Sequence, residues 1–187
     1  CPPYRVMSHS PLPSASLTLA ALDWRLLQPE DLPAMHALHL CSIEGMAAQT
    51  VKPETREFLH GLLLGRGRVI GAWHGAALAA YGVLQHDLLA QDDPRPLLGL
   101  APGQVLYKLA GAAVAPAWRG QGLQRQLTAR RVAWAGDAAL FASLAPGSLP
   151  RSRSLLPCGF AVRALHFPYG VHARHLLAPV PGAALAP

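Results

Sequence analysis

The chain is poor in charged and aromatic residues and has few cysteines. Charged side chains make up 14% of its 187 residues and aromatic ones 6%, whereas hydrophobic residues make up 51%. A chain this apolar can bury a sizeable core, so extensive disorder is excluded and one domain is expected. The three cysteines, Cys1, Cys41 and Cys158, are odd in number and widely spaced. They indicate neither a disulfide framework nor a zinc site, and they fit a reducing cytoplasm.

Signals for export or membrane insertion are also lacking. The first residues have no apolar segment of the kind found in signal peptides. Residues 69–86 are uncharged, but they contain two histidines, a glutamine and a His74-Gly75 break, which favours a hairpin of two buried strands over a membrane span. We expect a flexible lead-in over 1–21, one domain over 22–180 and a loose tail over 181–187, in a cytoplasmic protein without membrane contact.

Acidic residues are scarce: ten Asp and Glu face sixteen Lys and Arg, for a net charge of +6. An excess of arginine suits an anionic ligand, such as a nucleotide-containing cofactor or nucleic acid. A coding bias that favours arginine, alanine, proline and glycine would give the same composition, so charge alone does not decide between them.

The hydrophobic pattern and the turn signals predict one α/β domain. Pro29-Glu30-Asp31 and Pro53-Glu54 each place a proline and an acid where a helix begins, as the helix dipole favours. The predicted order is β-α-α-β-β-β-α-β-α-β-β, a mixed sheet with helices on its faces. The helices are expected near 29–44, 53–64, 122–135 and 148–157, and the strands near 22–27, 68–73, 77–85, 105–116, 139–146, 161–168 and 171–180. Residues 87–104, rich in proline and acid, are expected to form a long surface loop.

The most informative stretch is "APAWRGQGLQRQL", residues 115–127, in which a glycine turn opens a predicted helix. Backbone N–H groups in the first turn of a helix have no helical partners and point the same way as the positive end of the helix dipole. Glycines at 120 and 122 keep side chains away from an approaching phosphate. Arg119 adds a cation to the turn, and Arg125, Arg130 and Arg131 add positive charge along the helix.

Two common phosphate-binding motifs do not fit this turn. A Rossmann fingerprint would follow the first strand, whereas this turn follows the fourth, and Arg125 stands where its last glycine would be. A Walker A sequence is absent. Instead, "VAPAWRGQGL" resembles the central motif of the Gcn5-related N-acetyltransferases, the GNAT family. "WRLLQPEDLPAMHAL", "LAPGSLPRSRSLLPCGF" and "PYGVHARHLL" resemble, in order, other parts of the same fold.

The resemblance implies a mostly antiparallel mixed sheet of about seven strands with about four helices, which binds acetyl-CoA between the fourth and fifth strands. It implies a monomer or a homodimer and direct acetyl transfer to a primary amine of a small molecule or protein. No metal is expected, because no second cluster of ligands completes a zinc site, and no nucleic acid is expected as a partner. The backbone of the fourth strand would pair with the pantetheine arm, the turn would hold the pyrophosphate, and a polar residue of the next helix would contact the cofactor. The implied cofactor-binding residues are Ala112, Ala113, Val114, Arg119, Gly120, Gln121, Gly122, Leu123, Gln124 and Ser148.

The catalytic groups common in the family are missing. The fourth strand has no carboxylate to act as base, and Leu155 stands where many members have a tyrosine as acid. The replacement candidates are His86, Tyr107 and Tyr169, and a histidine titrates near neutral pH. Glu44 and Asp87 are candidate substrate-binding residues. For each of these five residues, local packing or bonding is an alternative role.

Three functions follow from these observations. The first is an acetyl-CoA-dependent N-acetyltransferase. The second, suggested by the missing base and acid, is a module that binds CoA or acyl-CoA and catalyses little. The third is a nucleic-acid-binding protein, which the thin spread of basic residues disfavours.

Overall fold

The computed structural model describes residues 19–45, 53–145, 155–169 and 172–180. Their strands form one seven-stranded sheet in the order β1-β2-β3-β4-β5-β7-β6. Neighbouring strands are antiparallel except β4 and β5, which are parallel. The predicted mixed, mostly antiparallel sheet is therefore confirmed. The strands are β1 (Asp23–Leu26), β2 (Gly67–His74), β3 (Ala77–Gln85), β4 (Leu106–Val114), β5 (Ala139–Leu144), β6 (Phe160–Tyr169) and β7 (His172–Pro179).

Four α-helices occur in the described residues: α1 (Leu32–Ile43), α2 (Arg56–Gly61), α3 (Arg95–Leu98) and α4 (Leu123–Ala135). None of these helices is both long and apolar enough to cross a membrane. Shorter helical segments are η1 (Leu19–Ala21), η2 (Pro29–Asp31), η3 (Leu62–Arg66), η4 (Ala90–Asp92), η5 (Pro116–Trp118) and η6 (Leu156–Cys158).

Three helical predictions need correction or fall outside the description. The segment 87–104, expected as a loop, contains η4 and α3. The helix expected over 53–64 is α2 followed by the π-helical segment η3, in which Gly65 has a φ of 116°. The helix expected near 148–157 lies mostly outside the described residues, as do residues 1–18 of the lead-in and the tail 181–187.

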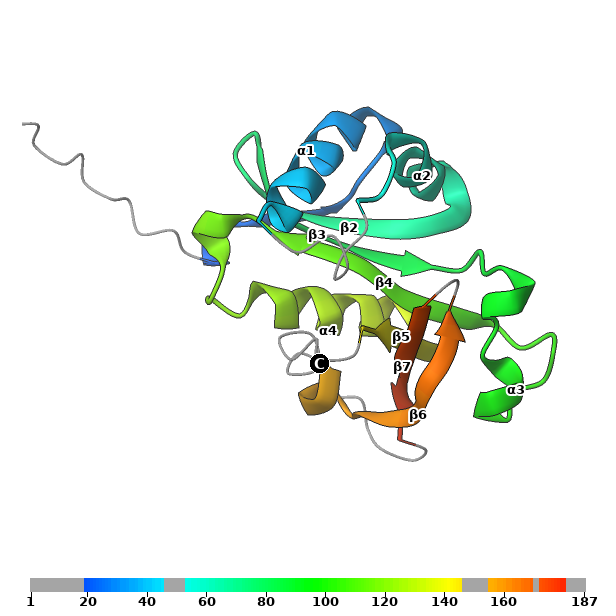
Figure 1. Cartoon of the computed structure of the whole chain (residues 1–187). Coiled ribbons are helices and arrows are strands. Elements are labelled where there is room, and N and C mark those ends of the chain that lie inside the picture. Colours follow the sequence, from blue (N-terminus) through cyan, green and yellow to red (C-terminus); the bar gives the residue numbers. More distant parts are fainter. Residues whose placement is uncertain (1–18, 46–52, 146–154, 170–171, 181–187) are drawn as a thin grey trace, which may run out of the picture.

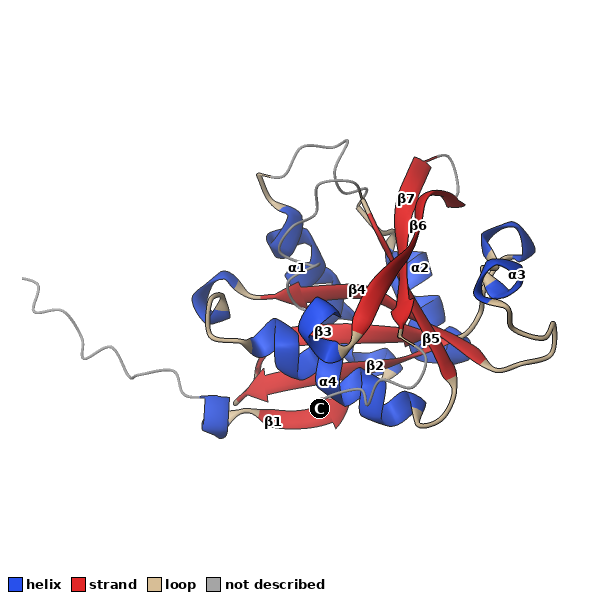
Figure 2. Ribbon diagram, turned by 90° about the horizontal axis from the view of Figure 1, so that it is seen from below, coloured by secondary structure: helices blue, strands red, loops and turns tan. Residues whose placement is uncertain are grey.

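Helices cover both faces of the sheet (Figure 1). Buried side chains of α1 and α2, such as Met35 and Leu59, pack on one face against Val69, Tyr81 and Ala113. On the other face, α4 buries Leu123 and Leu127 against β2 and β3, and Val132 and Ala135 against β4 and β5. In Figure 2, β1 to β4 run side by side, whereas β7 and β6 are turned steeply against them.

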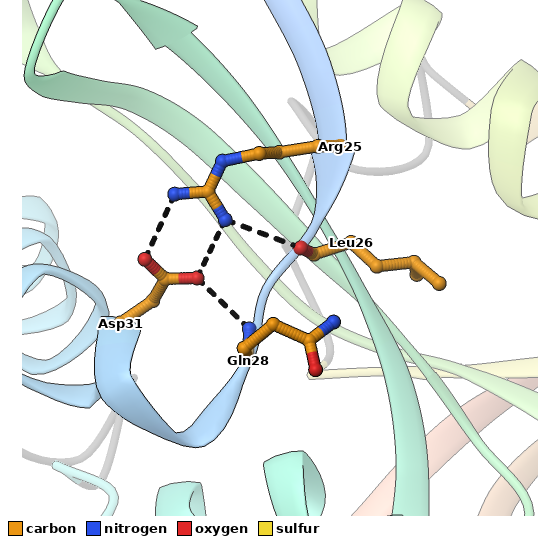
Figure 3. Close-up of polar contacts among 4 residues, drawn as sticks. All are labelled: Arg25, Leu26, Gln28 and Asp31. Carbon is orange, nitrogen blue, oxygen red and sulfur yellow. Dashed lines mark hydrogen bonds and ion pairs between the residues drawn. The ribbon is translucent and has the colours of Figure 1, made fainter.

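The start of α1 is fixed by an ion pair with β1 (Figure 3). The Arg25 guanidinium donates to both carboxylate oxygens of Asp31, at 2.7 and 2.9 Å, and the Gln28 N–H donates to the same carboxylate at 2.8 Å. The hydrogen bonds from Arg25 hold the pKa of the Asp31 carboxyl below its ordinary value. Arg25 also lies over the Trp73 ring, 4.3 Å from its centroid. The proline and acids predicted to open this helix do so.

Candidate functional site: the α4 turn and the gap beside β4

The turn before α4 has the backbone conformation of an anion-binding loop. Gly120 and Gly122 have φ values of 75° and 80°, in the left-handed region that glycine adopts without strain. A Cβ at either position would have no atom within 4 Å. Glycine is therefore required here by backbone conformation, and the space beside both residues is open. Trp118, buried under the turn, anchors it to the core.

Five consecutive N–H groups of this turn have no acceptor within the described part of the chain: those of Gly120, Gln121, Gly122, Leu123 and Gln124. The helical bonds begin only with Arg125 and Gln126, whose N–H groups donate to the Gly122 carbonyl at 3.0 and 3.2 Å. The positive end of the α4 dipole lies at the same place. Donors arranged in this way fit a pyrophosphate.

Arg119 and Gln121 contribute only backbone groups to the anion-binding turn, because their side chains form hydrogen bonds with other parts of the protein. The Arg119 guanidinium donates at 3.3 Å to the carbonyls of Val114 and Ser42, and so links the ends of β4 and α1. The Gln121 side chain donates to the Ala117 carbonyl at 3.1 Å. Gln124 lies half-buried in the first turn of α4.

A gap opens between β4 and β5 next to this turn. The two strands pair over three residues only, ending at Lys108 and Phe141. Beyond that point β4 pairs with β3, and β5 pairs with β7. Because the Ala115 N–H donates to the Ala79 carbonyl in β3, strand alternation turns the backbone groups of Ala113 towards β3 and those of Ala112 and Val114 towards the gap.

A β-bulge lies where the gap begins. Gly82 pairs with Ala112 and Leu84 with Leu109, so Ala110 and Gly111 together oppose Val83. The bulge shifts the alternation by one residue. The Val105 carbonyl accepts the Ala139 N–H, so the backbone groups of Val105 face β5. Strand alternation from Val105 then turns the backbone groups of Leu109 towards the gap. After the bulge, the backbone groups that face the gap are those of Ala112 and Val114. An extended segment from Ala110 to Val114 covers about 13 Å.

Two predicted catalytic residues meet at the other end of β4. The rings of His86 and Tyr107 lie edge to face, with centroids 6.2 Å apart. They line a cavity of about 380 Å³ together with Arg68, Arg95, Gly103, Gln104, Val105 and Leu106. Tyr107 lies seven residues before Val114, about 23 Å along an extended strand. The structure therefore brings this pair together but keeps it apart from the α4 turn.

The other predicted site residues are scattered. Glu44 is exposed just after α1, near the Ser42 carbonyl that Arg119 contacts. Asp87 follows β3 and forms an exposed ion pair with Arg66 at 2.7 Å. Tyr169 is the last residue of β6, and Ser148 lies outside the described residues. The two predicted substrate residues thus lie at opposite ends of the sheet.

The sequence did not reveal the environment of His39, which lies 7% exposed between α1 and β3. Its Nε2 accepts the Glu54 N–H at 2.9 Å, so in the neutral ring Nδ1 carries the proton and donates to the Tyr81 hydroxyl at 3.1 Å. Burial lowers the pKa of His39, and the neighbouring His36 lowers it further. Within the described residues, no three His, Cys, Asp or Glu side chains are grouped to hold a metal ion.

Leu155 stands where the resemblance would place an acidic tyrosine, and it is buried. Its side chain packs in the core with Leu109, Leu140 and Leu177 and is 3% exposed. A core leucine at this position provides no proton donor to a departing thiolate.

Comparison with known proteins shows the fold and no close relative. No protein-family model and no curated protein matches the chain. Among solved structures, NAA60 of Arabidopsis thaliana in complex with acetyl-CoA aligns with a TM-score of 0.66 at 17% identity, over 84% of this chain and 97% of that one. The ribosomal-protein-S18-alanine N-acetyltransferase of Escherichia coli gives 0.61 at 16% identity, over 84% and 92%. A GNAT-family acetyltransferase of Streptococcus pneumoniae gives 0.60 at 13%, over 84% and 98%.

Proposed function

Because the chain has the fold of the Gcn5-related N-acetyltransferases, as its sequence motifs predicted, we propose that it binds acetyl-CoA and transfers the acetyl group to a primary amine. The observation that carries the proposal is the row of five N–H donors from Gly120 to Gln124 beside the gap between β4 and β5. The relatives in fold are acetyltransferases, and two of them contain acetyl-CoA.

In this proposal the backbone holds the cofactor. The N–H groups of the α4 turn bind the pyrophosphate, and the helix dipole adds to the attraction. Ala112 and Val114 pair with the pantetheine arm as an additional strand would. Ala113, also predicted to contact the arm, instead lines the core below it, since its backbone faces β3. Ser148 stays a predicted contact.

Acetyl-CoA supplies an activated acetyl group on a thioester. The protein must orient that group, donate a hydrogen bond to its carbonyl oxygen as negative charge develops, and accept the proton that an ammonium acceptor loses. The backbone around the bulge, from Leu109 to Ala112, is the proposed donor, because the pantetheine arm runs along β4 from the turn towards it.

For the amine proton, the chain offers His86 with Tyr107, and Tyr169 of the last hairpin. His86 is the proposed acceptor, through intervening water, because its exposed imidazole lies beside Tyr107 at the cavity next to the start of β4. Substitution of His86 by Asn should then lower kcat without changing the affinity for CoA. An unchanged kcat at pH 7 would eliminate His86 as the base. Asp87 is proposed to attract a cationic acceptor, and Glu44, at the opposite end of the sheet, stays a predicted substrate contact.

A second function has support of its own. A CoA-binding module with little catalysis is favoured by the absence of a carboxylate from β4 and by the burial of Leu155 in the core. Both functions require the same cofactor site, so they differ only in turnover.

Two measurements separate the proposals. Thermal unfolding with acetyl-CoA, CoA and duplex DNA tests binding, since a ligand that binds the native state raises the melting temperature. If acetyl-CoA leaves the melting temperature unchanged, both functions are wrong. Thiol release from acetyl-CoA over a panel of primary amines then tests turnover, and release only in the presence of an amine supports the transferase.

A further inference from the structure

Arg131 is the largest fully buried side chain of the described residues, at 2% exposed. The sequence suggested that it adds positive charge to α4 for the cofactor, and the structure corrects this. Its guanidinium points into the core, where Nη1 donates to the carbonyls of Val83 at 3.2 Å and Ala110 at 3.3 Å. Nε donates to the Leu127 carbonyl of its own helix at 3.1 Å.

The two carbonyls that Nη1 reaches belong to the residues that face each other across the β4 bulge. Val83 is the single residue on the β3 side, and Ala110 is one of the two residues on the β4 side. A bulge interrupts the ladder and leaves backbone groups without regular strand partners. The Arg131 guanidinium donates to one carbonyl on each side of the bulge, and these two hydrogen bonds favour the bulged pairing.

Gly82 makes room for this arrangement. A Cβ on Gly82 would lie 3.0 Å from Nε of Arg131 and 3.2 Å from its Cδ and Cζ. The φ of Gly82 is not in the left-handed region, so this glycine is required by the space that the guanidinium occupies.

We infer that Arg131 is a positioning residue that, with Gly82, holds the β4 bulge in register and thereby fixes which backbone groups of β4 face the cofactor gap. Without the bulge, a one-residue shift would exchange the groups that face β3 with those that face the gap. Ala113 would then face the gap in place of Ala112 and Val114. The inference rests on the proposed function, because the gap matters as the place where the acetyl group is held.

The test uses three single variants of the full chain, the double variant Gly82→Ala/Arg131→Met and one control. Arg131→Met removes every donor at similar length, Arg131→Lys keeps one donor group, and Gly82→Ala displaces the guanidinium without removing it. Arg130→Met is the control: Arg130 is the neighbouring residue of α4, and its guanidinium lies over the Trp24 ring, 4.2 Å from the centroid, outside the core.

Two readouts are needed. The first is steady-state acetyl transfer alongside calorimetric CoA binding, and we expect Arg131→Met to lower kcat by about tenfold or more, equivalent to about 1.4 kcal/mol. CoA should still bind through the intact α4 turn, with an affinity lowered by the lost pairing of Ala112 and Val114 with the pantetheine arm. Arg131→Lys should recover part of kcat. Gly82→Ala should lower kcat when it is the only substitution. Added to Arg131→Met, it should lower kcat no further, because both substitutions disrupt the same contact between the guanidinium and the bulge.

The second readout is nuclear magnetic resonance of the cofactor-free protein. Amide shifts and hydrogen exchange of residues 109–112 should change in Arg131→Met, Arg131→Lys and Gly82→Ala, and stay as they are in Arg130→Met. Because this readout needs no turnover, it tests Arg131 even if the wild-type protein acetylates no amine, a result that would overturn the proposed transferase alone. If Arg131→Met does not fold, Gly82→Ala and Arg131→Lys carry the test. Unchanged bulge amides in the folded variants, or additive losses of kcat in the double variant, would overturn the role of Arg131.

Discussion

Gln124→Glu is the substitution that separates fold stability from cofactor binding most cleanly. The glutamine and glutamate side chains have nearly the same shape. Position 124 lies in the first turn of α4, and both residues adopt helical backbone angles there without strain. The only substantial change is one negative charge beside the five N–H donors. The charge should act in opposite directions on the free protein and on the complex.

In the free protein, a carboxylate in the first turn of a helix interacts favourably with the dipole, by about 0.3–1 kcal/mol. For a domain of this size, that corresponds to a rise of about 1–3 °C in the melting temperature. In the complex, the same carboxylate repels the pyrophosphate. One pair of like charges 4 Å apart costs about 1 kcal/mol in water and about 4 kcal/mol at the effective dielectric constant near a protein surface.

With partial screening, we expect a loss of about 1–3 kcal/mol in binding, or roughly 5- to 150-fold in the dissociation constant of CoA. The assay is isothermal titration calorimetry with CoA, with thermal unfolding of the free protein in parallel. The matched control is Gln91→Glu, the same change at an exposed position of η4 far from α4 along the chain. A variant that is more stable but binds CoA as tightly as the wild type would refute the placement of the pyrophosphate at this helix.

Gly122→Ala should weaken CoA binding through strain of about 1–2 kcal/mol at a left-handed position. Gly122→Glu should abolish CoA binding, because it adds a negative charge to that strain. Equal CoA affinities of the two variants by calorimetry would show that charge does not matter at this position. Gly111→Val should leave the melting temperature nearly unchanged, since a Cβ there meets no atom within 4 Å, yet weaken acetyl-CoA binding, and unaltered binding would move the acetyl group away from the bulge. His39 has a lowered pKa, so the unfolded chain takes up the proton first as pH falls below about 6.5 and stability declines. His39→Gln should reduce the pH dependence of the free energy of unfolding between pH 7 and pH 5. A pH profile parallel to that of the wild type would contradict this.

Those parts of the fold that depend on local sequence patterns were predictable. β3 has the bounds that its apolar run and the His74-Gly75 turn predict, and α4 begins after Gly122 and ends before Gly136 as expected. The hydrophobic period and the glycine positions carry this information within one segment, without reference to the rest of the chain. The α4 turn was found for the same reason.

The features that depend on two segments meeting were not predictable. The β4 bulge is set by the register between β3 and β4, and its only local trace is Gly111 in a run of alanines. Arg131 looked like one more basic residue of a basic helix, and only its spacing from the buried Leu127, Thr128 and Ala135 places it on the core face. The bonds of His39 to Glu54 and Tyr81 join three separate segments.

A crystal structure of the protein with acetyl-CoA is the most direct test of the central claim. We expect pyrophosphate oxygens within about 2.7–3.2 Å of N–H groups between Gly120 and Gln124, and a pantetheine arm that pairs with Ala112 and Val114 beside the β4 bulge. A cofactor bound elsewhere, or a pyrophosphate held by side chains away from the α4 turn, would contradict it.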